Sequence, residues 1–374
     1  MAKFVLYYGP RSEFVKIIPE RYYPLETLVK ICDSSYAYRK VEFDHIVGYS
    51  MSYSSITEGG IQNFCTILDR VDDSLESVYL QNPPECISDE IMRTYAKADI
   101  EVRRFKYRSV GKRQLKHINM RFDEEIIGQP KVKKQLLASL YELYRKKNKN
   151  LPVVFMFYGP SGVGKTETAK YLSTLLGGDL FRQQLSMYQT QGFFDYLYGA
   201  DHNRGSFAKD LLERKSNVVL LDEFDKAHPG IWSAFYQMFD EGHYMDKNYD
   251  VDLSNVIFIC TSNEPSPEAI RKKIGDPLYY RVNRYIEFQS LDLAAKKKMV
   301  SKIVYEEYMS LRPEEKAKIS LANLEERYLR GVEAFQNFRH ARNLIRNDIN
   351  QVLVEDFLIQ SNESEEIVSK SKGV

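Results

Sequence analysis

Cysteine is scarce in this chain, and long apolar runs are missing. Only four cysteines occur among 374 residues, namely Cys32, Cys65, Cys86 and Cys260. They lie too far apart for a zinc knuckle or a redox motif, so we exclude both kinds of site and expect small buried apolar side chains instead. No apolar stretch approaches the roughly 20 residues that a membrane helix requires. We therefore expect a globular, cytoplasmic protein without a membrane contact.

A strong net charge is also missing. The chain has 53 lysines and arginines against 52 aspartates and glutamates, which gives a formal charge of +1. A dedicated nucleic-acid-binding protein usually carries a large positive charge, so the composition does not favour that class. Seven basic residues nevertheless gather between Arg103 and Lys116. This basic strip is either a site for phosphate or nucleic acid, or a solvated face or linker, and the second is the more frequent case.

The first part of the chain has the pattern of a small α/β domain. Residues 4–8 and 77–80 are apolar and aromatic runs typical of strands, and residues 61–71 have helical spacing. We predict that this N-terminal domain covers residues 1–112.

A glycine-rich segment follows the apolar run at residues 152–158. It has the complete Walker A pattern, Gly159-Pro160-Ser161-Gly162-Val163-Gly164-Lys165-Thr166. Glycines let backbone N–H groups turn inward around phosphates, while Lys165 reaches the β and γ oxygens and the Thr166 hydroxyl binds Mg²⁺. A helix predicted over residues 166–176 directs its positive N-terminal end at the anion. The segment therefore predicts ATP and Mg²⁺ as cofactors.

Two further apolar runs end in polar residues. The first leads to Asp222 and Glu223, which fit a Walker B motif: Asp222 holds Mg²⁺ through its water shell, and Glu223 orients and polarises the attacking water. An acidic pair at a helix N-terminus is the alternative, but a Walker A motif upstream favours catalysis. The second run, residues 256–260, leads to Asn263, whose side chain can contact the γ-phosphate or the water. Lys165, Glu223 and Asn263 are the predicted catalytic residues from these motifs.

Several segments together closely resemble the Clp/Hsp100 family of AAA+ ATPases, in particular the second ATPase module of its unfoldases and disaggregases. Residues 220–229 nearly repeat the family's Leu-Leu-Asp-Glu-x-x-Lys-Ala-His-Pro string. Residues 126–130, Ile-Ile-Gly-Gln-Pro, resemble the box whose backbone frames the adenine, which assigns Ile127 and Gly128 to nucleotide binding. The resemblance covers about residues 119–350.

The resemblance implies an α/β fold, a P-loop AAA+ three-layer αβα sandwich followed by a small helical lid. The large ATPase domain is expected over residues 113–290 and the lid over residues 291–374. The polar tail from residue 361 is expected to fray. Family members assemble into rings of identical subunits, so we expect a ring, with a hexamer as the family norm.

Two arginines acquire a role only through the resemblance. Alignment back from Phe288 places Arg281 at the arginine finger, with Arg284 as the alternative. A finger stabilises transition-state charge at the γ-phosphate of the neighbouring subunit. Arg342 takes the position of the sensor 2 arginine on the lid. Without the resemblance, both would be ordinary surface ion-pair residues.

Two segments bear on the client and the partners. Counting back from the Walker B motif places Tyr198-Gly199 at the family's pore loop, which grips a polypeptide, although the match is partial. An aromatic residue beside glycine suits peptide or bases, and it can also belong to a core. Ile274-Gly275-Asp276 lies where peptidase-coupled members carry a hydrophobic tripeptide. Because its carboxylate resists desolvation, we do not expect a docked peptidase.

The leading functional hypothesis is a single-ring, Mg-ATP-driven remodeller or unfoldase of protein clients. Residues 1–112 then select the client or contact a partner protein encoded beside this one. One alternative is a nucleic-acid motor or recombination accessory ATPase that uses the basic strip. Another is a nucleotide-gated scaffold of an antiphage system.

Overall fold

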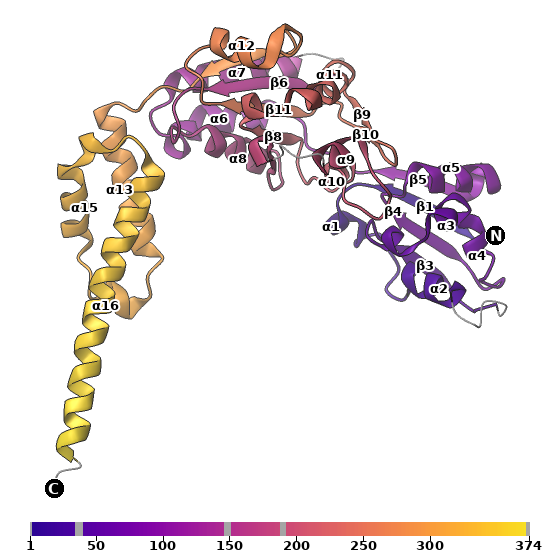
Figure 1. The fold of residues 1–374 in the computed structure, drawn as a ribbon, viewed down its shortest axis with the longest axis horizontal. Helices are drawn as coiled ribbons and strands as arrows, with labels where there is room; N and C mark the ends of the chain where they lie inside the picture. Colours follow the sequence, from indigo (N-terminus) through magenta and orange to yellow (C-terminus); the bar gives the residue numbers. More distant parts are fainter. Residues whose placement is uncertain (1, 34–39, 146–150, 188–191, 372–374) are drawn as a thin grey trace.

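The computed structural model describes residues 2–33, 40–145, 151–187 and 192–371, with side chains of the last helix up to residue 358. Two α/β domains and a helical C-terminal part follow one another along the molecule, and the termini lie at opposite ends (Figure 1). Within the described ranges, no helix is long and apolar enough to cross a lipid bilayer.

The N-terminal domain is built on a five-stranded parallel sheet in the order β2-β3-β4-β1-β5. Its strands are β1 (Lys3–Tyr8), β2 (Tyr23–Pro24), β3 (His45–Gly48), β4 (Ser77–Gln81) and β5 (Ile100–Arg104). Its helices are α1 (Arg11–Phe14), α2 (Leu25–Cys32), α3 (Glu58–Gln62), α4 (Phe64–Leu68) and α5 (Glu85–Thr94). Apolar side chains of β1, β3 and β4 form one core with α2 to α5. The predicted α/β character is confirmed, although the helix expected over residues 61–71 divides at Asn63.

The second domain contains another five-stranded parallel sheet, in the order β12-β6-β11-β8-β7. The strands are β6 (Val153–Tyr158), β7 (Phe181–Gln184), β8 (Val218–Asp222), β11 (Ile257–Ser262) and β12 (Arg284–Glu287). Helices cover both faces, which explains why β6, β8 and β11 are almost continuously apolar. Along β6, residues 154 and 156 enter one core and residues 155 and 157 enter the other, because side chains alternate along a strand.

Among the described residues, seven helices form the outer layers of this sandwich. The first face carries α6 (Lys112–Glu125), α7 (Pro130–Arg145) and α8 (Lys165–Leu175). The other face carries α9 (Gly192–Tyr198), α10 (Phe207–Leu212), α11 (Trp232–Glu241) and α12 (Pro267–Tyr279). The predicted three-layer αβα sandwich is confirmed. Cys65 and Cys260 are buried as expected, whereas Cys32 and Cys86 are partly exposed.

An antiparallel hairpin and short 3₁₀ turns complete the two α/β domains. The hairpin joins β9 (His243–Met245) to β10 (Asp250–Asp252). The 3₁₀ turns, which include one in the C-terminal part, are Ser52–Ser55, Lys97–Asp99, Leu185–Met187, Phe224–Lys226, Pro229–Ile231 and Val332–Ala334.

The helical C-terminal part is the expected lid. It consists of α13 (Leu293–Met309), α14 (Pro313–Lys316), α15 (Leu321–Arg330) and α16 (Phe338–Ser371). Its core joins α13, α15 and α16 and also receives Ile127 from the second domain. Helix α16 continues to Ser371, past residue 361, from which we expected the tail to fray, and the fraying itself stays a prediction. A helix nucleated on the lid core extends readily, because each further residue adds a hydrogen bond without a new nucleus.

The two α/β domains are joined through the carboxylate of Glu213, which directly follows α10. Its Oε1 accepts hydrogen bonds from Gln81 Nε2 at 2.6 Å and Asn82 Nδ2 at 3.0 Å, and its Oε2 accepts one from the Arg11 N–H at 3.0 Å. These donors lie at or just after the carboxyl ends of β1 and β4, the edge of a parallel sheet where ligands usually bind. The Glu213 side chain therefore fills this edge of the N-terminal sheet.

Three further contacts reinforce this junction. His202 Nε2 bonds to the Ile56 carbonyl at 2.7 Å. The Glu85 N–H donates to the Asn248 carbonyl at 2.8 Å. The fully buried Arg214 guanidinium stacks on the Tyr107 ring at 4.2 Å. The N-terminal domain is thus fastened to α10 and to the β9–β10 hairpin rather than tethered by the chain alone.

We expect Glu213→Ala to loosen this attachment. The two amides keep the Gly9 carbonyl as an acceptor, but the Arg11 N–H loses its carboxylate. Hydrogen bonds to charged groups contribute about 1.5–3 kcal/mol each. A loss of about 2 kcal/mol corresponds to roughly 30-fold faster hydrogen exchange at the Glu85 amide, whose acceptor, Asn248, belongs to the other domain.

Lys215→Ala is the matched control, because its exposed side chain pairs with Asp179 and contacts no residue of the N-terminal domain among the described ion pairs. Exchange at the Glu85 amide that is equal in both variants and the wild type would contradict a joining role for Glu213.

Candidate active site

The Walker A segment forms a tight loop between β6 and α8. Gly159 has a φ of 125°, and a Cβ at this position would lie 2.2 Å from the Phe288 carbonyl oxygen, so only glycine fits. Gly164 caps α8 in the left-handed region, at a φ of 102°, which turns the N–H groups of the loop toward one point. Of the predicted phosphate-binding residues, those from Ser161 to Thr166 line a large cleft.

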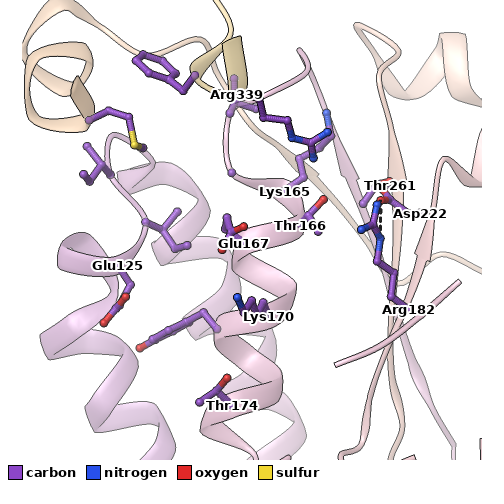
Figure 2. Close-up of a pocket in the computed structure, with 18 of the residues that line it drawn as sticks. Glu125, Lys165, Thr166, Glu167, Lys170, Thr174, Arg182, Asp222, Thr261 and Arg339 are labelled. Carbon is purple, nitrogen blue, oxygen red and sulfur yellow. Dashed lines mark hydrogen bonds and ion pairs between the residues drawn. The ribbon is translucent and has the colours of Figure 1, made fainter. Parts of the chain in front are cut away.

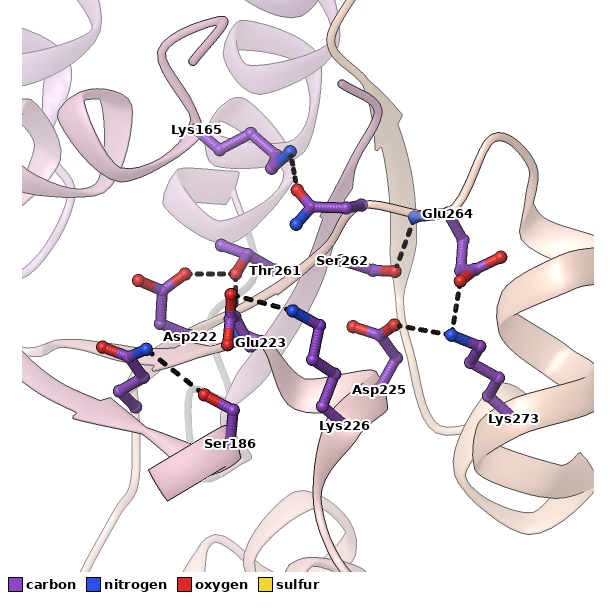
Figure 3. A network of polar contacts seen from close by, with 12 residues as sticks. Lys165, Ser186, Asp222, Glu223, Asp225, Lys226, Thr261, Ser262, Glu264 and Lys273 are labelled. Atoms are coloured by element: carbon purple, nitrogen blue, oxygen red, sulfur yellow. Dashed lines mark hydrogen bonds and ion pairs between the residues drawn. The ribbon is translucent and has the colours of Figure 1, made fainter. Parts of the chain in front are cut away.

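Lys165 lies almost fully buried at the base of this cleft. Its Nζ donates to the carbonyls of Gly159 at 2.6 Å and Pro160 at 2.8 Å. It also donates to Asn263 Oδ1 at 2.9 Å, the contact of Lys165 that Figure 3 marks. Burial lowers the pKa of Lys165 to about 8, against the attraction of Asp222 and Asp225. Lys165 and Asn263, which were predicted from separate motifs, are therefore brought into contact.

Asp222 ends β8 beside this lysine. One carboxylate oxygen accepts a hydrogen bond from the Thr261 hydroxyl, and the other accepts one from Arg182 Nη2 at 2.6 Å (Figure 2). Thr166 and Asp222 line the same cleft, and hydroxyl and carboxylate oxygens are donors that suit Mg²⁺. The residues present thus fit the cation that the Walker motifs imply. Arg182 could not be predicted from the motifs, since its place beside Asp222 follows from the pairing of β7 with β8.

Glu223 has a left-handed backbone, with a φ of 54°, which is unusual for a residue with a side chain. Its N–H donates to Thr261 Oγ1 at 2.9 Å, and its Oε1 accepts a hydrogen bond from Lys226 at 3.0 Å. A hydrogen bond from Ser186, together with the one from Lys226, lowers the pKa of Glu223. Strained conformations of this kind concentrate at functional sites, and here the carboxylate is held ionised at the cleft.

The cleft has a volume of about 1270 Å³, above the roughly 300–1,000 Å³ of typical ligand pockets. Walker A and the strand ends form its floor, and lid residues that include Met299, Ile303 and Phe338 form its other wall. Ile127 lines the cleft, whereas Gly128 packs against the lid, where a Cβ would lie 2.7 Å from Leu291 and Ala295.

Gln129 ties the cleft to the start of the lid. Its side-chain amide donates to the Val163 carbonyl at 3.2 Å and to the Gln289 carbonyl at 2.8 Å. The Gln289 N–H donates back to Gln129 Oε1 at 3.2 Å. Gln129 is almost fully buried and thus links the Walker A loop directly to the chain segment that leads into α13.

The two arginines assigned through the resemblance have different surroundings. Arg342 lines the cleft, and its guanidinium pairs with Glu306 and Glu307. Arg281 is not among the described residues that line the cleft; it pairs with Asp240 at 2.6 Å and lies over the Tyr236 ring. The alternative finger, Arg284, lies 3.6 Å from Glu142.

The register of β12 on β6 places Arg281 at the amino end of the sheet. The Asn283 N–H donates to the Val154 carbonyl at 2.9 Å, near the beginning of β6. Walker A begins where β6 ends, and six strand residues span about 20 Å. Arg281 therefore lies at the edge of the sheet opposite to its own phosphate site.

Tyr198, which we placed at the pore loop, lies at the end of a helix and is held there by side-chain contacts. It ends α9, its hydroxyl bonds to Ser233 at 2.7 Å, and its ring stacks on Phe194. Gly199, with a φ of 80°, ends the helix immediately afterwards. The ring remains partly exposed, so the assignment of Tyr198 to the pore stays a prediction.

The basic strip and the segment Ile274-Gly275-Asp276 also have defined positions in the structure. The basic strip is divided between the domains: Arg103 pairs with Glu101, Arg104 lies over Tyr8, and Arg113 lines the cleft. In α12, Ile274 is buried and Asp276 is held by two hydrogen bonds from Arg271. Neither residue presents an exposed apolar side chain.

Comparison with known proteins points to one group. Residues 150–315 match a family model described as "AAA domain (Cdc48 subfamily)". A ClpA homolog protein of Fuscovulum blasticum is 38% identical over 128 residues, 32% of this chain and 16% of that protein. The mitochondrial disaggregase of Homo sapiens is 34% identical over 167 residues, 40% of this chain and 23% of that protein. The chain thus aligns with less than a quarter of the length of these relatives.

The fold has a counterpart among solved structures. A structure of Hsp104 in a closed state with ATPγS and casein matches 83% of this chain and 61% of its own chain, with a TM-score of 0.54. At 20% identity, this likeness concerns the arrangement of the elements.

We expect the affinity of the protein for ATP to fall as the pH rises through about 8. Above this pH, Lys165 of the protein without nucleotide loses its proton. It has to regain that proton to pair with a phosphate. Each further pH unit then weakens binding by up to about tenfold. Titration with a fluorescent ATP analogue from about pH 7 to about pH 9.5, at constant Mg²⁺, measures this dependence.

Lys165→Arg is the matched control, since a guanidinium stays charged over this range. Its affinity, whatever its absolute value, should show no break near pH 8. A wild-type profile without a break would contradict the lowered pKa of Lys165.

Proposed function

We propose, from the similarity of its ATPase domain to the Clp/Hsp100 family of AAA+ ATPases, that this chain hydrolyses Mg-ATP to remodel or unfold protein clients. The observation that carries the proposal is the contact of Lys165 with Asn263 in a cleft that Asp222 and Glu223 also line. Binding, metal and water-activating groups thus converge on one point.

Each of these residues has a role in phosphoryl transfer to water. Lys165 and the Walker A N–H groups bind the β and γ phosphates, and Thr166 and Asp222 would hold Mg²⁺. The cation supplies charge neutralisation at the phosphate oxygens. Glu223, kept ionised by its hydrogen bonds, orients a water and accepts its proton, while Asn263 orients the γ-phosphate or the water.

We propose a ring, with a hexamer as the family norm, because Arg281, acting as an arginine finger, would reach a γ-phosphate only in a second subunit. Arg281 lies at the amino edge of the sheet, about 20 Å by strand length from its own Walker A loop. Its pairing with Asp240 and its stacking on Tyr236 hold the guanidinium in place for a neighbouring chain. A γ-phosphate that Arg281 contacts therefore belongs to another copy.

A protein client is favoured over nucleic acid, since relatives are named as a disaggregase and as ClpB chaperones. The N-terminal domain lies next to the Tyr198 segment: Asn248 accepts from the Glu85 N–H and donates to the Ala200 carbonyl at 3.0 Å. We propose that this domain presents the client, or a partner protein, to Tyr198. The buried Ile274 and the bonded Asp276 support action without a docked peptidase.

We expect Glu223→Gln to bind ATP with near wild-type affinity. It should hydrolyse ATP at least about 100-fold more slowly, because the amide accepts no proton. Steady-state phosphate release and binding of a fluorescent ATP analogue measure the two effects. Glu268→Gln, an exposed carboxyl change on α12, is the matched control. Normal turnover by Glu223→Gln would show that another group activates the water.

We expect Arg281→Ala to lose about 10³-fold in turnover while it still binds ATP. Lys165→Ala should be inactive because it cannot bind the phosphates, whereas Arg281→Ala still binds ATP. Mixing the two variants should restore part of the ATPase rate, because an intact Walker A site of one copy then meets an intact Arg281 of the other. Absence of any recovery, in mixtures shown to co-assemble, would contradict a site shared between subunits.

A further inference from the structure

The lid directs two arginines of the first turns of α16 into the cleft, and one of them is already neutralised. Arg342 pairs with Glu306 at 2.5 Å and with Glu307 at 2.8 Å. Glu307 is only 7% exposed and also accepts hydrogen bonds from Arg346. A move of Arg342 toward a phosphate would leave the buried Glu307 carboxylate with a single cation, which is unfavourable.

Arg339 has the opposite surroundings. Its side chain is exposed in the cleft, and the described part of the chain offers it no ion pair. The guanidinium points toward Lys165 (Figure 2), and its charge contributes to the lowered pKa of that lysine after burial. Two cations thus converge on one point of the cleft, and a polyanion is the ligand that relieves their repulsion.

The start of α16 is positioned on the Walker A loop by Asn337. Asn337 Oδ1 accepts the Arg339 N–H at 2.9 Å. The same oxygen lies 3.1 Å from where a Cβ on Gly162 would be. The backbone of Arg339 is therefore held against the loop that binds the phosphates, while its side chain stays available.

We propose that Arg339, and not Arg342, is the lid cation that contacts the terminal phosphates of the bound nucleotide, a role that rests on the proposed ATP-binding function. Arg342 instead joins α16 to α13 through Glu306 and Glu307. Since Arg339 belongs to α16, its contact with the γ-phosphate draws the lid toward the Walker A loop when ATP is bound. Loss of that phosphate removes the contact, so Arg339 makes the lid sensitive to the state of the nucleotide.

Equilibrium binding of fluorescent ATP and ADP analogues to the full-length chain tests this role. We expect Arg339→Ala to weaken ATP binding about tenfold, which corresponds to the loss of one charge-assisted contact. ADP binding should be weakened clearly less. Arg339→Lys should recover most of the ATP affinity. Arg330→Ala, which removes an exposed arginine from α15 of the same lid, is the matched control and should bind both analogues like the wild type.

Arg342→Ala separates the two arginines. It should lower the thermal unfolding midpoint and leave the ratio of ATP to ADP affinity unchanged, as expected of a residue that only joins helices. Loss of ATP preference in Arg342→Ala, with Arg339→Ala equal to Arg330→Ala, would overturn the inference and leave ATP binding intact. A wild-type chain that binds ATP no better than Lys165→Ala would overturn both the inference and the proposed function.

Discussion

The common direction of the strands in the ATPase sheet is the constraint on which the site depends. Because β6, β8 and β11 are parallel neighbours, the residues that follow their carboxyl ends meet at one edge. Lys165 and Asn263 touch there although 98 positions separate them in the chain. The same direction sends Arg281 to the opposite edge, at the amino end of β6. One geometric fact therefore assembles the phosphate site and also places Arg281 away from it.

Much of this edge could be predicted from sequence because its determinants are local. Glycines that adopt positive φ angles, such as Gly164, specify a phosphate loop whatever surrounds them. The acid pair Asp222-Glu223 and the polar end of β11 each follow an apolar run, so parallel pairing alone brings them together. The αβα sandwich could also be predicted from local sequence, since strands covered on both faces have continuous apolar sequences.

What could not be predicted depends on side chains that meet only in the folded chain. The Glu213 carboxylate reaches Gln81 and Asn82 across more than 130 positions, and no local pattern marks such a contact. Arg342 fits the family motif, yet its neutralisation by Glu306 and Glu307 on α13 is visible only once the lid is packed. The contact of Tyr198 with Ser233 could not be predicted either, since Ser233 lies on another helix.

The segments that hold the N-terminal domain are close in the chain to the strands of the phosphate site. Glu213 precedes the strand that ends in Asp222, and the hairpin that holds Asn248 leads into the strand that ends near Asn263. Both catalytic strands are thus directly connected in the chain to segments that hold the N-terminal domain.

The steady-state ATPase rate of the purified full-length protein, measured alone, with an unfolded polypeptide and with single-stranded DNA at low salt, tests the central claim most directly. A protein remodeller should be stimulated by the polypeptide and be indifferent to the DNA. Stimulation by DNA alone, or a rate that neither addition changes, would contradict remodelling of protein clients by this ATPase.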